Sequence, residues 1–254
     1  MNWAARRRFV ILSLIGVVAL GVLIALSTTI FYKAPSCSDG VQNQGEAGID
    51  CGGPCAYLCT ADVHAPTVLF TKALTGSAGH TDVIASIENI NAGAAAKGVP
   101  YTVTLYGTGQ VFVQKVSGVL DLPPAATVPV FIHGITTGNQ KVVRAFLSID
   151  SSQFSWFTPT GAARTVPVVT NTTVSGAPEA PRIDAVLTNN SVAPLTDVRA
   201  VILVHSAQGE VIAASETIVP SIPAQGTAAA TFTWNNAFPS APAAIEVIPV
   251  IPLP

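Results

Sequence analysis

Hydrophobic and polar positions divide the chain into two regions with different periodicity. From Phe9 to Phe31 there are 23 residues without a charge, whereas beyond residue 66 short apolar runs alternate with turn residues. At a rise of about 1.5 Å per residue the first run makes a helix of roughly 34 Å, and a membrane hydrocarbon core is about 30 Å thick. The pattern therefore predicts a single transmembrane helix over residues 9–32.

Basic residues beside the apolar run predict its orientation. Arg6, Arg7 and Arg8 precede the run, and positive flanks stay in the cytoplasm. Residues 1–8 are then a cytoplasmic stub, and the C-terminal region is extracytoplasmic. The alternative is a cleaved signal peptide with a weak cleavage candidate at Ala25-Leu26-Ser27, but apolar regions of signal peptides are only about 7 to 15 residues long. The length favours an uncleaved anchor in a cell membrane.

The rest of the chain has the pattern of strands. YTVTLY (Tyr101 to Tyr106) alternates apolar and polar residues, and AVILVH (Ala200 to His205) is rich in β-branched residues. Each is followed by a glycine-containing turn and a further apolar run, which indicates a hairpin. Short strands with frequent turn signals are typical of all-β sandwiches. We expect two tandem immunoglobulin-like β-sandwiches, at 66–160 and 182–254, joined by a linker at 161–181.

The two β regions resemble each other in sequence. When they are aligned from Val83 and Ile183, Asn89 coincides with Asn189 and Val119 with Val219. Collinear similarity of this kind predicts that both regions are copies of one structural unit.

Composition and charge narrow the class of function. Only 10% of the residues are charged, against about 25% in an average soluble chain. Residues 34–254 hold eight basic and all fourteen acidic residues, a net charge of −6. Nucleic-acid binding requires a basic surface that displaces phosphate counterions. We therefore expect no nucleic-acid partner.

All four cysteines lie in one short segment, which we define as the collar, residues 35–60. They are Cys37, Cys51, Cys55 and Cys59. An even number of cysteines outside the cytoplasm indicates disulfides, and four cysteines allow three connectivities. A structural zinc site is the alternative, but such sites usually have two C-x2-C-like knuckles. The spacing C-x13-C-x3-C-x3-C has none, so we expect two disulfides.

Oxygen-bearing side chains between the cysteines are candidate ligands for a cation. Asp39, Asn43, Glu46 and Asp50 could bind calcium, which prefers oxygen ligands on a flexible loop. The alternative is that these side chains cap turns, since Asp and Asn commonly do so. The turn-capping interpretation is favoured, and no other cofactor is expected.

Two resemblances add to this picture. The stretch CSDGVQNQGEAGIDCGGPC resembles a C-x-D-G-x-Q-N…D-C-G-G-x-C module found in secreted and surface-anchored bacterial proteins, although its last interval is C-x3-C where C-x-x-C is common. The second β region, from Ile183, is similar to FxLYD and CARDB-like extracytoplasmic immunoglobulin-like modules. Together they imply a bacterial cell-surface location and a β-sandwich fold, and they imply no ligand.

The sequence contains no recognisable catalytic motif. It has neither an H-E-x-x-H nor a G-x-S-x-G pattern, so we expect a non-enzymatic protein. Trp156 and Trp234 are interpreted as core residues, with exposed carbohydrate-binding platforms as the alternative. The predicted function is structural or adhesive, through protein partners at the cell envelope. The alternative is an accessory subunit of a secretion, pilus-associated or transport complex in the membrane.

Overall fold

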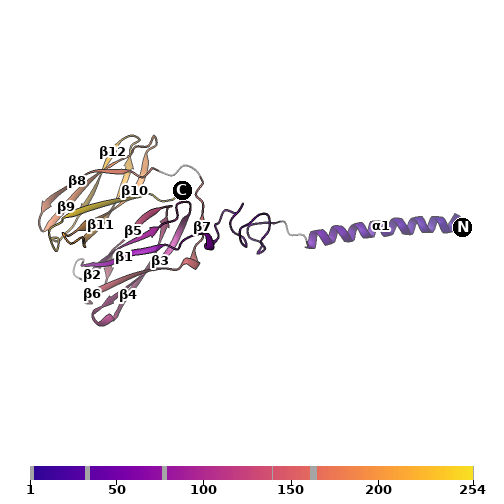
Figure 1. Cartoon of the computed structure of the whole chain (residues 1–254), viewed down its shortest axis with the longest axis horizontal. Helices are drawn as coiled ribbons and strands as arrows, with labels where there is room; N and C mark the ends of the chain where they lie inside the picture. The colour runs from indigo at the N-terminus through magenta and orange to yellow at the C-terminus, as the bar shows by residue number, and fades with distance from the viewer. Residues whose placement is uncertain (1–2, 32–34, 76–78, 139, 161–164, 254) are drawn as a thin grey trace. The chain divides into compact units, whose positions relative to one another are not determined.

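The computed structural model describes residues 3–31, 35–75, 79–138, 140–160 and 165–253 (Figure 1). It contains one N-terminal helix, the disulfide-bonded collar and antiparallel β-sheets, which confirms the predicted all-β class with an N-terminal helix. The chain forms two compact units, residues 1–56 and 57–254.

Helix α1 (Trp3–Phe31) begins six residues before the predicted start at residue 9, and Tyr32 lies outside the described residues. Its part from Arg6 to Ile30 is long and apolar enough to span a membrane. Near its end the hydroxyls of Thr28 and Thr29 donate to backbone carbonyls three residues earlier, both at 2.9 Å. Such bonds satisfy polar groups within the helix itself, as a hydrocarbon environment requires.

The first β-sandwich consists of two sheets. Strand order in one sheet is β1-β2-β5, and in the other β4-β3-β6, with β7 paired to the start of β3. The strands are β1 (Thr67–Thr75), β2 (His80–Asn89), β3 (Ala95–Gly107), β4 (Phe112–Leu122), β5 (Ala126–Thr136), β6 (Val142–Ile149) and β7 (Trp156–Phe157). Short 3-10 turns precede β1 at Thr60–Asp62, connect β3 to β4 at Thr108–Gln110 and connect β6 to β7 at Ser151–Gln153. Alternate residues of both sheets fill the first core, among them Val83, Val103, Leu122 and Trp156.

The second β-sandwich has the same strand order. Its sheets are β8-β9-β12 and β11-β10-β13. The strands are β8 (Val168–Ala177), β9 (Ala180–Thr188), β10 (Leu195–His205), β11 (Val211–Ile222), β12 (Thr227–Thr233) and β13 (Ala244–Val250). The second core lies between these sheets and includes Ile183, Ile202, Ile222 and Phe232.

A buried asparagine occupies the same place in both sandwiches. Asn89 ends β2, is 1% exposed, and donates to the carbonyls of Ala94 and Pro123 at 2.8 and 2.7 Å. Asn189 directly follows β9, is fully buried, and donates to the carbonyl of Pro223 at 3.0 Å. In each sandwich this side chain connects two turns that are about 30 residues apart in sequence.

The two sandwiches pack against each other through a third apolar core. It is formed by Leu74, Ile84, Val201, Leu203, Val211 and Ala214. Its members come from β1 and β2 of the first sandwich and from β10 and β11 of the second. Strands β2 and β10 are therefore buried on both faces, which explains their almost continuous apolar sequence.

Polar contacts border this third core. Lys72 forms an ion pair with Glu210 at 3.3 Å, and Arg199 lies 3.6 Å from the carboxylate of Glu216. The second distance is too long for a hydrogen bond. Burial raises the pKa of Glu216, and the charge of Arg199 opposes that shift. The border is thus polar and partly buried, as expected between packed domains of one chain.

Two predicted boundaries require correction. Residues 168–177, placed in the 161–181 linker, form strand β8, because the run VVTNTTV is rich in β-branched residues; residues 161–164 lie outside the described residues. The first sandwich also begins earlier than residue 66. Leu58, assigned to the collar, donates its backbone N–H to the carbonyl of Trp156 at 2.8 Å and packs against the first core.

Candidate functional site: an aromatic groove on the first sandwich

The cysteines of the collar are all in disulfides. Cys37 and Cys55 are bonded at 2.02 Å, Cys51 and Cys59 are disulfide-bonded as well, and none is free. The Cys37–Cys55 bond selects one of the three possible connectivities. The two sulfurs of this bond and a carboxylate oxygen of Glu46 lie within 4.8 Å of one another. Because both sulfurs are bonded to each other, they are not thiolate ligands for zinc.

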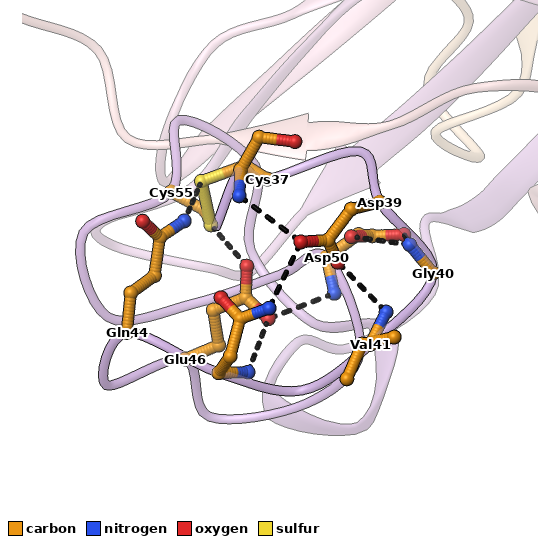
Figure 2. The surroundings of a disulfide bond; sticks show 10 residues. Cys37, Asp39, Gly40, Val41, Gln44, Glu46, Asp50 and Cys55 are labelled. Atoms are coloured by element: carbon orange, nitrogen blue, oxygen red, sulfur yellow. Dashed lines mark hydrogen bonds between the residues drawn. A yellow bond between two sulfur atoms is a disulfide. The ribbon is translucent and has the colours of Figure 1, made fainter. Parts of the chain in front are cut away.

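The structure brings the four predicted calcium ligands together in one hydrogen-bonded loop (Figure 2). Asp39 caps a turn: its carboxylate accepts from the backbone N–H groups of Ser36 at 3.1 Å and Val41 at 2.9 Å. It also accepts from the side-chain amide of Asn43 at 2.9 Å. This is the Asx-turn chemistry that the sequence suggested as the alternative to calcium.

Glu46 and Asp50 also accept hydrogen bonds from the backbone of the loop. One Glu46 oxygen accepts from the backbone N–H groups of Asn43 and Asp50, both at 3.3 Å. Asp50 accepts from the backbone N–H of Gly40 at 2.9 and 3.1 Å. The other Glu46 oxygen lies 3.2 Å from Cys55 Sγ, which carries no hydrogen in a disulfide and therefore donates none. Glu46 is only 6% exposed, so these contacts hold the centre of the loop.

We predict that calcium does not stabilise the collar, because its carboxylates already accept hydrogen bonds from the backbone. Melting temperatures of the full-length protein in millimolar calcium and in excess chelator should coincide. Asn43 Oδ1 is buried without a hydrogen-bond partner, so it is the atom at which a cation would act. A melting temperature that rises with calcium and loses that rise in Asp39→Asn would contradict the prediction.

Trp156 and Trp234 are packing residues. Trp156 is 2% exposed, and its ring packs edge-on against Phe154 with centroids 5.5 Å apart. Trp234 packs edge-on against Phe238 at 5.0 Å and donates its Nε1–H to the carbonyl of Ala214 at 3.2 Å. Neither ring forms an exposed carbohydrate-binding platform.

Exposed aromatic rings lie instead on the outer face of sheet β4-β3-β6. Along β3, Val103 and Leu105 point into the first core, and the alternate residues Thr104 and Tyr106 face outward. The strand register places residues of β4 and β6 beside them. Three rows cross the sheet from β4 to β6: Phe112, Tyr106 and Arg144; Lys115, Thr104 and Phe146; Ser117, Thr102 and Ser148.

Two phenylalanine side chains on this face are more than half exposed to solvent. Phe112 is 57% exposed and Phe146 is 56% exposed. The ring of Phe146 meets that of Tyr106 edge-on, with centroids 5.9 Å apart. Single exposed apolar residues need no explanation, but a group of aromatic residues on one face marks an interaction surface.

The aromatic face is hollowed into a groove, which we define by its lining residues. The groove has a volume of about 890 Å³ and is lined by Thr104, Tyr106, Gly107, Thr108, Gly109, Gln110, Val143, Arg144, Phe146 and Ser148. One wall is the β3–β4 turn, where Gly109 and Gln110 have φ of 70° and 63°. Ligand sites typically have volumes of about 300 to 1,000 Å³. This hollow is within that range.

The groove region is basic although the chain is acidic. Residues 99–120 and 140–149 carry Lys115, Lys141 and Arg144 and no acidic residue. Within the described part of the chain, none of these three side chains forms an ion pair. An unpaired arginine beside aromatic rings is suited to bind a planar anion such as a carboxylate.

Sequence reasoning did not find this site. The alternation in YTVTLY places Tyr106 on the face of the strand opposite Val103 and Leu105, yet the runs around Phe112 and Phe146 are apolar on both sides. A phenylalanine in such a run is usually buried. The available signal was the absence of acidic residues across two long segments of an acidic chain.

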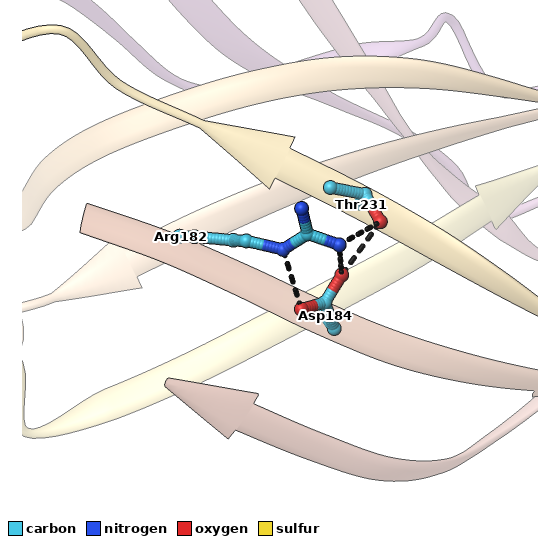
Figure 3. Close-up of polar contacts among 3 residues, drawn as sticks. All are labelled: Arg182, Asp184 and Thr231. Carbon is cyan, nitrogen blue, oxygen red and sulfur yellow. Dashed lines mark hydrogen bonds and ion pairs between the residues drawn. The ribbon is translucent and has the colours of Figure 1, made fainter. Parts of the chain in front are cut away.

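The outer face of the second sandwich has different electrostatics (Figure 3). There Arg182 donates to both carboxylate oxygens of Asp184, at 2.7 and 2.8 Å, and Thr231 donates to the same carboxylate at 2.6 Å. These hydrogen bonds lower the pKa of Asp184, and the paired carboxylate raises the pKa of Arg182. This arginine is therefore already neutralised, in contrast to Arg144.

We expect Asp184→Asn to lower the melting temperature at neutral pH but not in strong acid. Because the folded-state pKa of Asp184 lies below its unfolded value, its stabilisation is present above that unfolded value of about 3.9 and is lost as pH falls through the folded-state pKa. Thermal unfolding across this range checks the result. Asp197→Asn, at an exposed position, is the control. A difference in melting temperature between wild type and Asp184→Asn that stays the same at every pH would contradict the prediction.

Comparison with known proteins assigns the chain to no family. No family model matches the chain, and no curated protein matches it. Forty-nine solved chains show some similarity in structure. One is red sea bream transglutaminase, with 12% sequence identity and a TM-score of 0.28 over 74% of this chain. The chain spans 29% of that protein, and a likeness this low carries no inference about activity.

Proposed function

We propose that this protein is a membrane-anchored contact protein of the bacterial cell envelope, which binds its target through the aromatic groove. The helix of residues 6–30 would be the anchor, with Arg6, Arg7 and Arg8 on the cytoplasmic side. Disulfides persist in oxidising compartments, so the bonded cysteines support an extracytoplasmic position for the rest of the chain. The two sandwiches would then present the groove outside the cell.

The observation that carries this proposal is the group of exposed aromatic rings in a basic hollow. Burying Phe146 and Tyr106 on a partner would remove apolar surface from water, which is favourable by about 25 cal/mol of free energy per Å² buried. Rings at the centre of an interface contribute much of the binding energy. The proposed role is therefore binding, without a chemical step.

Cell-surface binding tests the proposal. The full-length protein is expressed in its membrane, and binding of intact cells to isolated envelopes of neighbouring cells is measured for wild type and Phe146→Ala. We expect an affinity loss of about tenfold, because truncating a central aromatic residue typically costs more than 1 kcal/mol. Val174→Ala, 53% exposed on β8, is the control for an exposed apolar residue and should bind like wild type.

The accessory-subunit role is a distinct outcome of the same variants. If affinity purification from native membranes recovers stoichiometric membrane proteins that Phe146→Ala no longer retains, the groove holds a complex together rather than a neighbouring cell. If Phe146→Ala behaves like Val174→Ala in both assays, the groove is not the binding site and the proposal is wrong.

A further inference from the structure

We infer that the groove takes an acidic oligosaccharide, a short chain of hydroxylated sugar rings that carry carboxylates. The inference rests on the proposed function, because it identifies the ligand class of the same site. It follows from three features of the groove: its aromatic rings, its hydroxyl groups and its uncompensated positive charge.

The aromatic rings fit the apolar face of a sugar ring. A pyranose presents C–H groups on its faces and hydroxyls at its edge, so it packs on aromatic surface while it forms hydrogen bonds sideways. Phe146 supplies exposed ring surface in the groove, and Phe112 lies in the row next to it. Tyr106, between them, combines an apolar ring with a polar hydroxyl, as is common where a surface is partly wet.

Hydroxyl and amide groups surround these rings. Thr104, Thr108, Gln110 and Ser148 line the groove and offer both donors and acceptors. A protein-binding surface of the usual kind has a larger apolar core and buries about 800 Å² on each partner. A hollow with mixed aromatic and hydroxyl lining is instead typical of a site for a compact polar ligand.

The charge selects an acidic ligand. Arg144 lines the groove in the same row as Tyr106, and Lys115 lies beside Thr104 on the same sheet. No carboxylate within the described residues is paired with either side chain. A guanidinium donates two parallel hydrogen bonds to a carboxylate, so a uronic-acid unit placed on Phe146 would meet Arg144 with its charged group.

Titration of the full-length protein in lipid nanodiscs tests this inference. The probe is the hexamer of galacturonic acid, and its fully methyl-esterified form is the matched neutral control with the same sugar backbone. We expect the acid to bind at least about tenfold more tightly than the ester, because the ester lacks the charge-assisted hydrogen bonds. Added salt should lower the affinity of the protein for the acid and leave its affinity for the ester nearly unchanged.

Variants assign the binding to the groove. Arg144→Gln should reduce the affinity for the acid about tenfold, to the value for the ester. Phe146→Ala should instead reduce the affinity for both the acid and the ester. Arg182→Gln removes a positive charge from the outer face of the second sandwich and is the charge control. All variants are first compared with wild type in thermal unfolding, which separates loss of the site from loss of the fold.

Three results overturn the inference in distinguishable ways. Equal affinity for acid and ester would exclude charge selection. Tight binding of hexaglutamate but not of either sugar would assign the groove to an acidic peptide and leave the proposed contact function intact. If neither sugar nor peptide binds and Phe146→Ala also leaves envelope binding unchanged, both the ligand class and the proposed function fail.

Discussion

Replacing Asn189 with aspartate is expected to lower the free energy of unfolding by about 3 kcal/mol or more, because it replaces a buried amide donor with an oxygen that faces carbonyl acceptors. The Asn189 amide donates to the carbonyls of Ala193 at 2.8 Å and Pro223 at 3.0 Å. Its oxygen accepts from the backbone N–H of Ser191 at 2.9 Å. Aspartate keeps that acceptor, but its second oxygen faces carbonyls.

Chemical denaturation of the full-length protein measures this loss. Asn190→Asp is a matched control, since it makes the same chemical change at the next residue, and Asn190 is exposed. It should alter the free energy of unfolding by less than about 0.5 kcal/mol. Asn89→Asp should reproduce the large loss, because Asn89 has equivalent contacts in the first sandwich. Equal behaviour of Asn189→Asp and Asn190→Asp would show that the buried amide is not required.

Replacing Val201 with aspartate is expected to separate the unfolding of the two sandwiches. Val201 is fully buried in the third core, on the face of β10 opposite the second core. An unpaired charge there costs several kcal/mol or forces the surfaces apart. Calorimetry should show one cooperative transition for wild type and two for the variant, and the radius of gyration should increase.

A matched control separates this effect from any loss of stability that a new surface charge causes elsewhere in the protein. Val174→Asp makes the same change at an exposed site on β8 and should retain one transition. Should Val201→Asp fail to fold, Val201→Ala provides the same information at a lower cost of about 2 kcal/mol. A single transition at the wild-type temperature in Val201→Asp would contradict the assigned role of the third core.

Local sequence features predicted the elements but not how the sandwiches assemble. The alternation of YTVTLY is explained by burial of Val103 and Leu105 on one face of β3. The run AVILV in β10 has no alternation because Ile202 contributes to the second core while Val201 contributes to the third. This difference was visible in the sequence. Which surface covers the second face could not be read from it, since Leu74 and Ile84, which share the third core with Val201, lie far from β10 in the sequence.

The collar shows a similar division. Cysteine count and spacing predicted disulfides correctly, but three pairings were equally compatible with the sequence. Only the positions of Cys37 and Cys55 in space select one of them. The acidic residues of the loop also required the structure, because a carboxylate that caps a turn and a carboxylate that binds a cation occur in the same sequence context.

The sequence by itself determined features that depend on neighbouring residues: the apolar helix, the strands, the turns and the cysteine-bonded segment. Periodicity and turn chemistry act over a few positions, so a single sequence is enough to show them. The groove and the third core were decided by tertiary structure alone. Phe112, Tyr106 and Arg144 come from three strands, and only the register of those strands places them in one row. Distant residues become a surface when the sheet forms, and a linear pattern does not contain that register.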